Sequence, residues 1–338
     1  MTCSPISTTA CAPLKVVPDD IEDQGSELLN EDIQEAFYSQ GINDEFMAAQ
    51  ARLEARTFGT VKSTNTAHIP SEIRAVATKC MHQIVSISNL EADRLYEMIA
   101  LFDLYCFRCD RDVAELCKSL PVVIGAIVRL VGKHHNQSFC EDGCILALGA
   151  SLKNHLASSY GVSSDLITVV ATNRMEMVVL ETTDWNVILP TVHWWSVSLM
   201  ARFTALLQQR DLPRLSWIWQ QFTRMKMAQL TQIIKPSDLA PRHMAVGIFA
   251  LGLARANMLP VSVLFPDENE AWKHFVEHDP QGYQASNSCI SDGHKAIIEK
   301  MQIATGASLE SIREHCHAIM SFSIAFARTQ FGVSSAGG

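Results

Sequence analysis

The stretch 119–133, SLPVVIGAIVRLVGK, constrains the fold more than any other part of the sequence. Almost every position from Val122 to Val131 is apolar, so the stretch has no polar face to turn towards solvent. A helix that is apolar all round has to be covered on all sides by other elements. It is shorter than the roughly 20 apolar residues that cross a bilayer, and Arg129 interrupts it. We therefore expect the central helix of an all-α domain.

The ends of this helix carry their own signals. Ser119 is expected to cap its N-terminus, with Pro121 in the first turn, where a missing N–H costs nothing. Lys133 is expected at its C-terminal end, where the helix dipole favours a cation and the side chain can reach a partner. A strand over 122–128 stays open as an alternative, because short apolar runs fit both structures.

Charge is distributed unevenly along the 338 residues. Residues 1–50 contain ten Asp or Glu against Lys15 alone, so this segment carries the whole net charge of −9. The rest of the chain, with 26 basic and 26 acidic residues, is neutral overall. This distribution lacks the basic footprint of a nucleic-acid-binding protein, so we expect no nucleic-acid partner.

The ten cysteines are unevenly spaced, and no signal peptide precedes them. They are expected to be reduced thiols of an intracellular protein in the nucleus, the cytoplasm or both. A zinc site is an alternative, although the spacing matches no zinc finger. Its candidate ligands are Cys106, Cys109, His134, His135, Cys140 and Cys144. We expect no metal and no cofactor, and no enzymatic activity, because no nucleophile, base and orienting group converge.

Helical patterns recur along the rest of the chain, and the 12 prolines and 16 glycines leave room for long helices. Residues 1–30 lack apolar periodicity and are expected to be disordered. One or two helices are expected over 30–56, lying over the first domain. A helix capped by Asn89 is expected to end at 106. The other expected helices cover 71–85, 145–156, 165–183, 193–209, 216–234, 242–254, 294–301 and 309–326. These elements predict an all-α fold with an acidic segment at 1–69 and two five-helix domains at 70–190 and 191–330.

Several short motifs then follow one another in the order found in the cyclin box. Residues 72–76, EIRAV, resemble its Met-Arg-Ala-Ile-Leu opening, and residues 131–133, VGK, resemble its Ala-Ser-Lys. Residues 174–180, RMEMVVL, resemble the Arg-Met-Glu motif with a Leu four residues on, and Pro190-Thr191 follows at the cyclin offset. Over roughly 70–255 the chain is therefore similar to the cyclin family, which implies two tandem cyclin boxes.

The resemblance also implies roles for four residues. Arg74 and Asp103 match an ion pair between the first two helices, and each lies among apolar positions where an unpaired charge would be costly. Lys133 and Glu176 match the residues with which cyclins bind a kinase, and both can bond backbone groups of a partner. On the residues alone, Lys133 could instead cap its helix and Glu176 could face solvent.

Other positions depart from the cyclin pattern. Leu104 and the pair His134-His135 stand where cyclins carry an Arg and an acidic pair. In the patch with which some cyclins bind Arg-x-Leu peptides, Ala77 and Cys80 stand where those cyclins carry Leu and Trp, and Lys79 and Gln83 replace the acidic residues. This degenerate substrate-docking patch consists of Ile73, Ala77, Cys80 and Gln83, with Lys79 beside it. We expect it to bind no such peptide.

The resemblance therefore implies a regulatory cyclin that binds and activates the catalytic subunit of a cyclin-dependent protein kinase, in cell-cycle control. Neither a membrane nor a small-molecule ligand is expected to take part. The alternative is a kinase-independent adaptor with a cyclin fold, acting in transcription or as a scaffold, because a fold does not fix a function.

Overall fold

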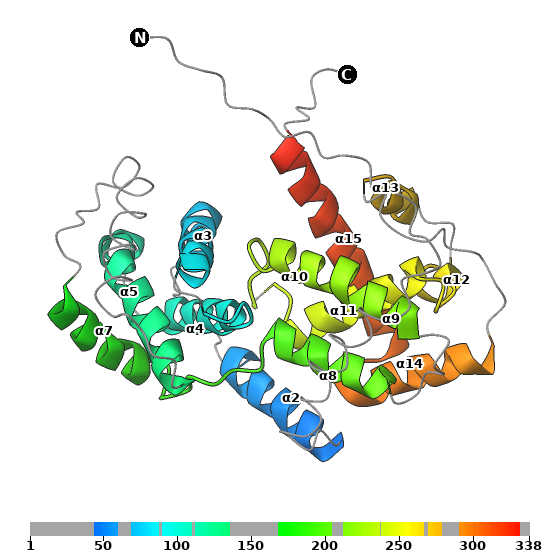
Figure 1. Ribbon diagram of the computed structural model, residues 1–338, viewed down its shortest axis with the longest axis horizontal. Coiled ribbons are helices and arrows are strands. Elements are labelled where there is room, and N and C mark those ends of the chain that lie inside the picture. Colours follow the sequence, from blue (N-terminus) through cyan, green and yellow to red (C-terminus); the bar gives the residue numbers. More distant parts are fainter. Residues whose placement is uncertain are drawn as a thin grey trace, which may run out of the picture.

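The computed structural model describes most of the chain as helices joined by short connections (Figure 1). None of the described residues forms a strand, so the fold is all-α. The described ranges are 44–59, 69–87, 90–109, 112–135, 168–204, 212–236, 238–266, 270–278 and 291–331. The expected disorder of 1–30, the cap Asn89 and the expected helix at 145–156 all lie outside these ranges.

One group of helices is built around α5 (Val113–His134), on the left of Figure 1. Its members are α3 (Ser71–Ile87), α4 (Arg94–Arg108), α5 and α7 (Val169–Thr182). Helix α5 contacts each of the other three, and its positions from Leu120 to Gly132 are buried on every side. The prediction of a central apolar helix is confirmed, and the alternative of a strand over 122–128 is wrong.

The start of α5 differs from the prediction. The helix begins at Val113 and is capped by Asp112, whose side chain accepts a hydrogen bond of 2.7 Å from the backbone N–H of Glu115. Ser119 therefore lies inside the helix, where its hydroxyl donates to backbone carbonyls of the preceding turn. Pro121 is also internal, so the sequence signal that predicted a first turn belongs to the middle of a longer helix.

A second group of helices surrounds α11 (Pro241–Arg255), which is also buried on most sides. Helices α8 (Val192–Thr204) and α15 (Leu309–Phe331) pack directly against α11. The remaining members are α9 (Leu212–Trp217), the π-helical segment η3 (Ile218–Thr223), α10 (Arg224–Leu230), α12 (Val261–Leu264), α13 (Glu270–His278) and α14 (Asp292–Thr305). Neither α12 nor α13 was predicted, although Trp272, Phe275 and Val276 of α13 follow one another at helical spacing and face the second core.

The buried hydrophobic residues form two large clusters that match the two groups of helices. The first cluster takes its residues from 69–131 and adds Val179 of α7. The second takes its residues from 192–320 and adds Met47. A small third cluster of Ala100, Leu104 and Leu189 lies at the junction. The change from one core to the other therefore falls between α7 and α8.

Helix α2 (Asp44–Gly59) lies under this junction in Figure 1. It packs against α14, and Met47, only 1% exposed, belongs to the second cluster. Its other end places Phe58 against the third cluster. The expectation that this helix lies over the first domain is therefore wrong, because its main buried contacts are with the second group.

Candidate functional site

Lys133 and Glu176 come together although 43 positions separate them in the sequence. Lys133 lies in the last turn of α5 and Glu176 in the middle of α7, and these two helices pack closely. The Nζ atom of Lys133 lies 2.7 Å from Oε2 of Glu176. In the free chain the two side chains therefore form an ion pair with each other.

Arg129 completes this arrangement from one helical turn before Lys133. Its Nε atom lies 3.0 Å from Oε1 of Glu176, so the carboxylate is placed between two cations. The Glu176 side chain is 10% exposed, whereas that of Lys133 is 51% exposed. Glu176 thus does not face solvent. This role of Arg129 was not predicted from the sequence, although its spacing of four residues from Lys133 puts both side chains on one side of α5.

Exposed apolar side chains lie on α7, the helix that carries Glu176, and on the connection that follows it. Val170 is 61% exposed and Met177, the residue after Glu176, is 46% exposed. Val169 is also exposed, and so are Trp185 and Ile188 in the connection to α8. Large apolar side chains gathered along one helix and the connection that follows it are characteristic of surfaces that bind another protein.

The connection after α7 holds Trp185 in a constrained conformation. Asp184 and Trp185 both have positive φ, of 51° and 60°, which is unusual for non-glycine residues and strained for a large aromatic one. The backbone N–H of Trp185 donates to the carbonyl of Leu180 at 2.8 Å, and the carboxylate of Asp184 forms an ion pair with Arg108 of α4. These contacts fix the turn with its tryptophan 62% exposed.

The histidines that replace the acidic pair of cyclins have a structural contact. His135 follows α5, and its Nε2 atom lies 2.7 Å from Oε2 of Glu97. Glu97 belongs to α4, so this contact ties the end of α5 to the neighbouring helix. The rings of His134 and His135 meet edge to face. The departure from the cyclin pattern here is accompanied by a local packing of its own.

Arg74 and Asp103 also come together, between α3 and α4. Nε and Nη2 of Arg74 each lie 2.7 Å from a different carboxylate oxygen of Asp103. Both residues are buried, at 1% and 8% exposure. Burial by itself would lower the pKa of Arg74, but the charge and hydrogen bonds of Asp103 outweigh it and raise that pKa above its ordinary value.

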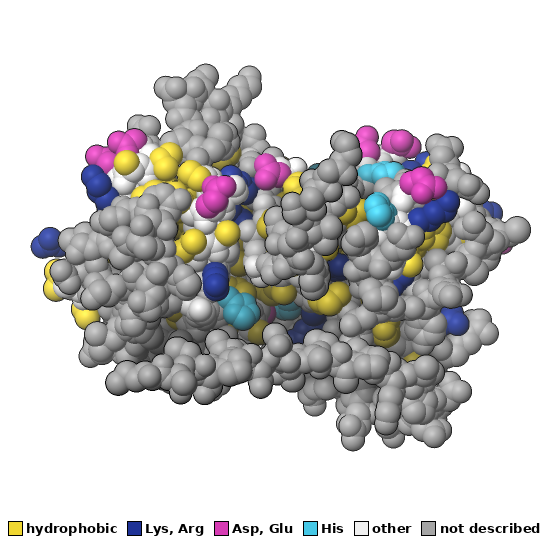
Figure 2. All heavy atoms as spheres, turned by 90° about the horizontal axis from the view of Figure 1, so that it is seen from above, with side chains coloured by type: hydrophobic (Ala, Val, Ile, Leu, Met, Phe, Trp, Pro, Cys, Tyr) yellow, Lys and Arg dark blue, Asp and Glu magenta, His cyan; other side chains and the backbone are white. Residues whose placement is uncertain are grey.

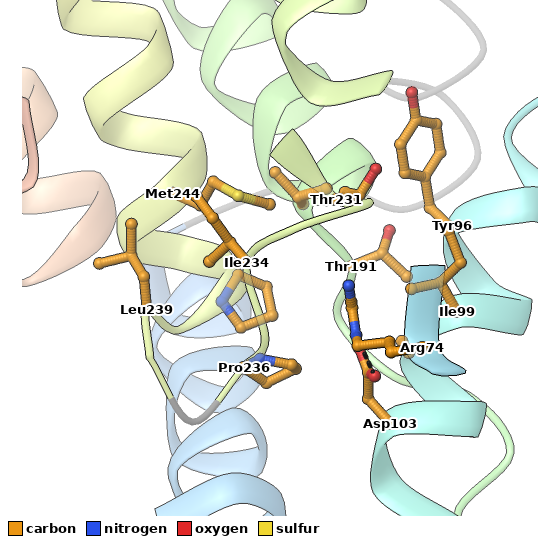
Figure 3. A pocket seen from close by; sticks show the side chains of 13 residues that line it. Arg74, Tyr96, Ile99, Asp103, Thr191, Thr231, Ile234, Pro236, Leu239 and Met244 are labelled. Atoms are coloured by element: carbon orange, nitrogen blue, oxygen red, sulfur yellow. Dashed lines mark hydrogen bonds and ion pairs between the residues drawn. The ribbon is translucent and has the colours of Figure 1, made fainter. Parts of the chain in front are cut away.

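This pair lines a cavity of about 30 Å³ between the two groups of helices (Figure 3). Ile234, Pro236 and Met244 line the opposite side, from the second group. Nearby, Nζ of Lys235 donates to the carbonyl of Ile69 at 2.9 Å and so bridges the two groups. The ion pair is therefore placed where the groups meet, and its position suits a structural role.

The residues of the predicted substrate-docking patch do not form a surface. Ile73, Ala77 and Cys80 are at most 1% exposed and belong to the first hydrophobic cluster, and Gln83 is half-buried. These residues are therefore not a surface patch, because the apolar stripe of α3 faces α4 and α5, and the absence of Arg-x-Leu binding stays a prediction. The exposed side of α3 instead carries Ala75, Lys79, His82 and Ser86.

The candidate zinc ligands are not brought together in the described part of the chain. Cys106 is buried in the first cluster, and burial raises the pKa of its thiol well above the ordinary value. Cys109 is half-buried, and the described residues contain no group of three or more His, Cys, Asp or Glu side chains suited to a metal. Cys140 and Cys144 lie outside the described ranges.

Neither a protein-family model nor a curated protein matches this sequence. Within the described ranges, every helix is too short or too polar to cross a bilayer. On the face seen in Figure 2, basic and acidic side chains are interspersed among the described residues, without a continuous basic area. Function is therefore inferred from the surface around Lys133, Glu176 and α7.

Proposed function

We propose that this chain is a cyclin-like regulatory subunit that binds and activates the catalytic subunit of a cyclin-dependent protein kinase. The observation that carries the proposal is the Lys133–Glu176 ion pair beside the exposed apolar side chains of α7. The resemblance to cyclin motifs supports it, because Lys133 and Glu176 match the residues with which cyclins bind a kinase. The same resemblance suggests a role in cell-cycle control and a location in the nucleus, the cytoplasm or both.

The surface offers both components that such an interface needs. Val170 and Met177 provide apolar area that a partner helix can cover. Lys133, half exposed, can donate to backbone carbonyls, and Glu176 can accept from backbone N–H groups. Partner-binding surfaces commonly combine an apolar centre with a few directed polar contacts of this kind.

Activation would follow from docking, with no chemistry performed by this chain. In protein kinases a mobile helix must be held in place for the catalytic Lys–Glu pair to form and for the activation loop to open. Moving a kinase from almost fully inactive to almost fully active requires roughly 5.5 kcal/mol of differential affinity between its two states. The surface on α5 and α7 would bind the active position of that helix preferentially.

The direct test is co-purification from cells with a matched pair of variants. Met177 on α7 and Ile303 on α14 are equally exposed, at 46% and 47%, but Ile303 belongs to the other group of helices. The wild type and Ile303→Asp should retain a bound kinase and its activity, and Met177→Asp should lose both. A kinase retained equally by all three would contradict the proposed surface. Capture through α7 of partners that include no kinase would favour the adaptor alternative.

A further inference from the structure

Helix α2 is attached to the second group of helices through a buried carboxylate. Glu54 is 2% exposed, and its Oε2 atom accepts two hydrogen bonds. One comes from Nε1 of Trp195 on α8 at 2.8 Å, and the other from the backbone N–H of Arg242 at the start of α11 at 3.0 Å. A single side chain thus joins α2 to two other helices.

The other carboxylate oxygen of Glu54, Oε1, has no donor at hydrogen-bond distance among the described residues. The nearest cationic atom to Oε1 is Nε of Arg242 at 3.7 Å, which is an ion-pair distance but too long for a hydrogen bond. A buried carboxylate needs close pairing and full hydrogen bonding to remain ionised without a large cost. The geometry at Glu54 therefore favours the protonated form more than a solvent-exposed glutamate would.

Apart from Glu54, α2 is held by its packing against α14 and by a few apolar and aromatic side chains. Met47 is its one fully buried apolar residue, and Phe46 makes an edge contact with Trp194 at 5.9 Å between ring centroids. Phe58 is half-buried at the far end. The exposed side of the helix carries Arg52 and Arg56. The contacts of Glu54 thus add a buried polar link to α8 and α11, which the packing on α14 does not provide.

We propose that α2 is a pH-sensitive strap, which holds to α8 and α11 more tightly when Glu54 is protonated than when Glu54 is ionised. In this structure the strap spans the junction of the two groups of helices (Figure 1). A looser strap at higher pH would free the start of α11 and the indole N–H of Trp195. The proposal is independent of kinase binding.

The direction of the pH effect follows from the pKa of Glu54. Burial raises this pKa from 4.5 to about 7, although Arg242 and the hydrogen bonds act in the opposite direction. A released α2 would return Glu54 to water and to its ordinary pKa. The attached state therefore binds the proton more tightly, and attachment weakens as the pH rises from about 4.5 through about 7.

Other titratable groups near α2 have to be separated from this effect. Arg242 is the charged group within 4 Å of the Glu54 carboxylate among the described residues. His243 adjoins Arg242 and stacks on His315 at 4.2 Å, and burial lowers the pKa of both, that of His243 to about 4. The helices α8, α11 and α14 carry the further groups His193, Arg202, Arg255, Asp292, His294, Lys295, Glu299 and Lys300. Between pH 5.5 and 7.5 His243 stays neutral.

Hydrogen exchange measured by mass spectrometry tests the strap. Opening constants of α2 amides are determined at pH 5.5, 6.5 and 7.5, corrected for intrinsic exchange rates, for the wild type and for Glu54→Gln. Glutamine keeps an acceptor for Trp195 and for the Arg242 N–H but does not titrate. In the wild type the opening constant of α2 should rise about 20-fold across this range, and in Glu54→Gln it should stay constant.

Amides of α5 in the same molecule serve as the internal reference, because α5 belongs to the other core. If Glu54→Gln does not fold, the ratio of α2 to α5 opening constants in the wild type still has to rise with pH. A wild-type ratio that is constant, or that falls as the pH rises, would overturn the proposal. So would an equal pH dependence in wild type and Glu54→Gln.

Discussion

Arg74 and Asp103 form a bidentate ion pair in which two guanidinium nitrogens each lie 2.7 Å from a different carboxylate oxygen. The third nitrogen, Nη1 of Arg74, is buried and makes no hydrogen bond to the described residues. The pair lies beside the cavity at the junction of the two cores. Loss of either partner would leave a charge buried at the point where the two groups of helices meet.

Asp103→Ala is therefore expected to destabilise the protein strongly. Stranding one member of a buried pair costs about 3–5 kcal/mol, so the midpoint of urea unfolding should fall sharply. Lys295→Ala, which breaks an exposed pair with Asp292, is the control and should leave the midpoint unchanged. Equal midpoints for Asp103→Ala and wild type would show that the buried pair contributes nothing to stability.

Lys133→Ala and Glu176→Ala should differ in stability although both remove the same ion pair. Lys133 is half exposed, so its loss should cost less than about 1 kcal/mol. Glu176 is buried beside Arg129, so Glu176→Ala should cost about 3–5 kcal/mol by leaving Arg129 without this carboxylate. Thermal unfolding of the two variants checks the order, and equal melting temperatures would contradict it.

Lys133→Ala is consequently the cleaner variant for measuring kinase binding. Truncation of an interface anchor costs about 2 kcal/mol or more, which corresponds to a loss of roughly 30-fold in affinity. Titration calorimetry with the kinase identified by co-purification should show this loss in a protein whose melting is unchanged. Unaltered affinity would remove Lys133 from the proposed interface.

An Arg-x-Leu peptide should bind no more tightly than about millimolar. The apolar residues of α3 are used in the core, and its exposed side carries Lys79, which repels an arginine, and His82. Fluorescence polarisation with a labelled peptide measures the affinity, and a peptide with Arg replaced by Glu is the control. A dissociation constant in the low micromolar range for the Arg peptide would contradict this expectation.

The stacked pair His243 and His315 should make the second group of helices sensitive to acid. Burial lowers both pKa values below the ordinary 6.5, that of His243 to about 4, so the contribution of His243 to stability is fully present above pH 6.5 and is lost as the pH falls towards 4. The titration of Glu54 increases stability as the pH falls over the same range. Melting is therefore measured in a protein that already carries Glu54→Gln. Melting temperatures should fall between pH 6.5 and 4.5, and less steeply when His243→Phe is added.

Gly252 should tolerate no side chain. A Cβ atom there would lie 2.8 Å from Cγ2 of Ile218 and 3.1 Å from Cδ1 of Phe222, both in the π-helical segment η3. Overpacking of this kind typically costs about 1–3 kcal/mol, so Gly252→Ala should lower the melting temperature. Gly293→Ala in α14 is the control, because its nearest neighbour would be 3.6 Å away. Equal effects of the two substitutions would contradict the close packing of α11 on η3.

Prediction from the sequence succeeded where a residue pattern is compatible with only one structural environment. The apolar run in α5 must be covered on all sides, and Arg74 and Asp103 at apolar positions must find partners. The start of α5 was misplaced because Ser119 and Pro121 are compatible with a helix start as well as a helix interior. Where a helix is amphipathic, as in α3, its pattern identifies the buried side, whereas the resemblance to cyclins implies a binding surface on that same side.

Glu54 shows a different limit of sequence reasoning. In the sequence the apolar residues Phe46 and Leu53 indicate one side of this helix, whereas the buried side is displaced by one residue and contains Met47 and Glu54. A glutamate on a buried side looks like a break in the pattern. Its partners Trp195 and Arg242 lie 141 and 188 positions away, so only the folded chain identifies them.

The Lys133–Glu176 contact also determines what kind of recognition this surface can perform. Because the two groups already satisfy each other, a partner exchanges one set of polar contacts for another, and its net gain is a difference between them. A partner that offers only a donor or only an acceptor would leave one of the two groups unsatisfied and be rejected. Lys133 and Glu176 neutralise each other, and Arg129 leaves the cluster with a single positive charge. Selectivity among partners would therefore reside mainly in the dissociation rate of the complex.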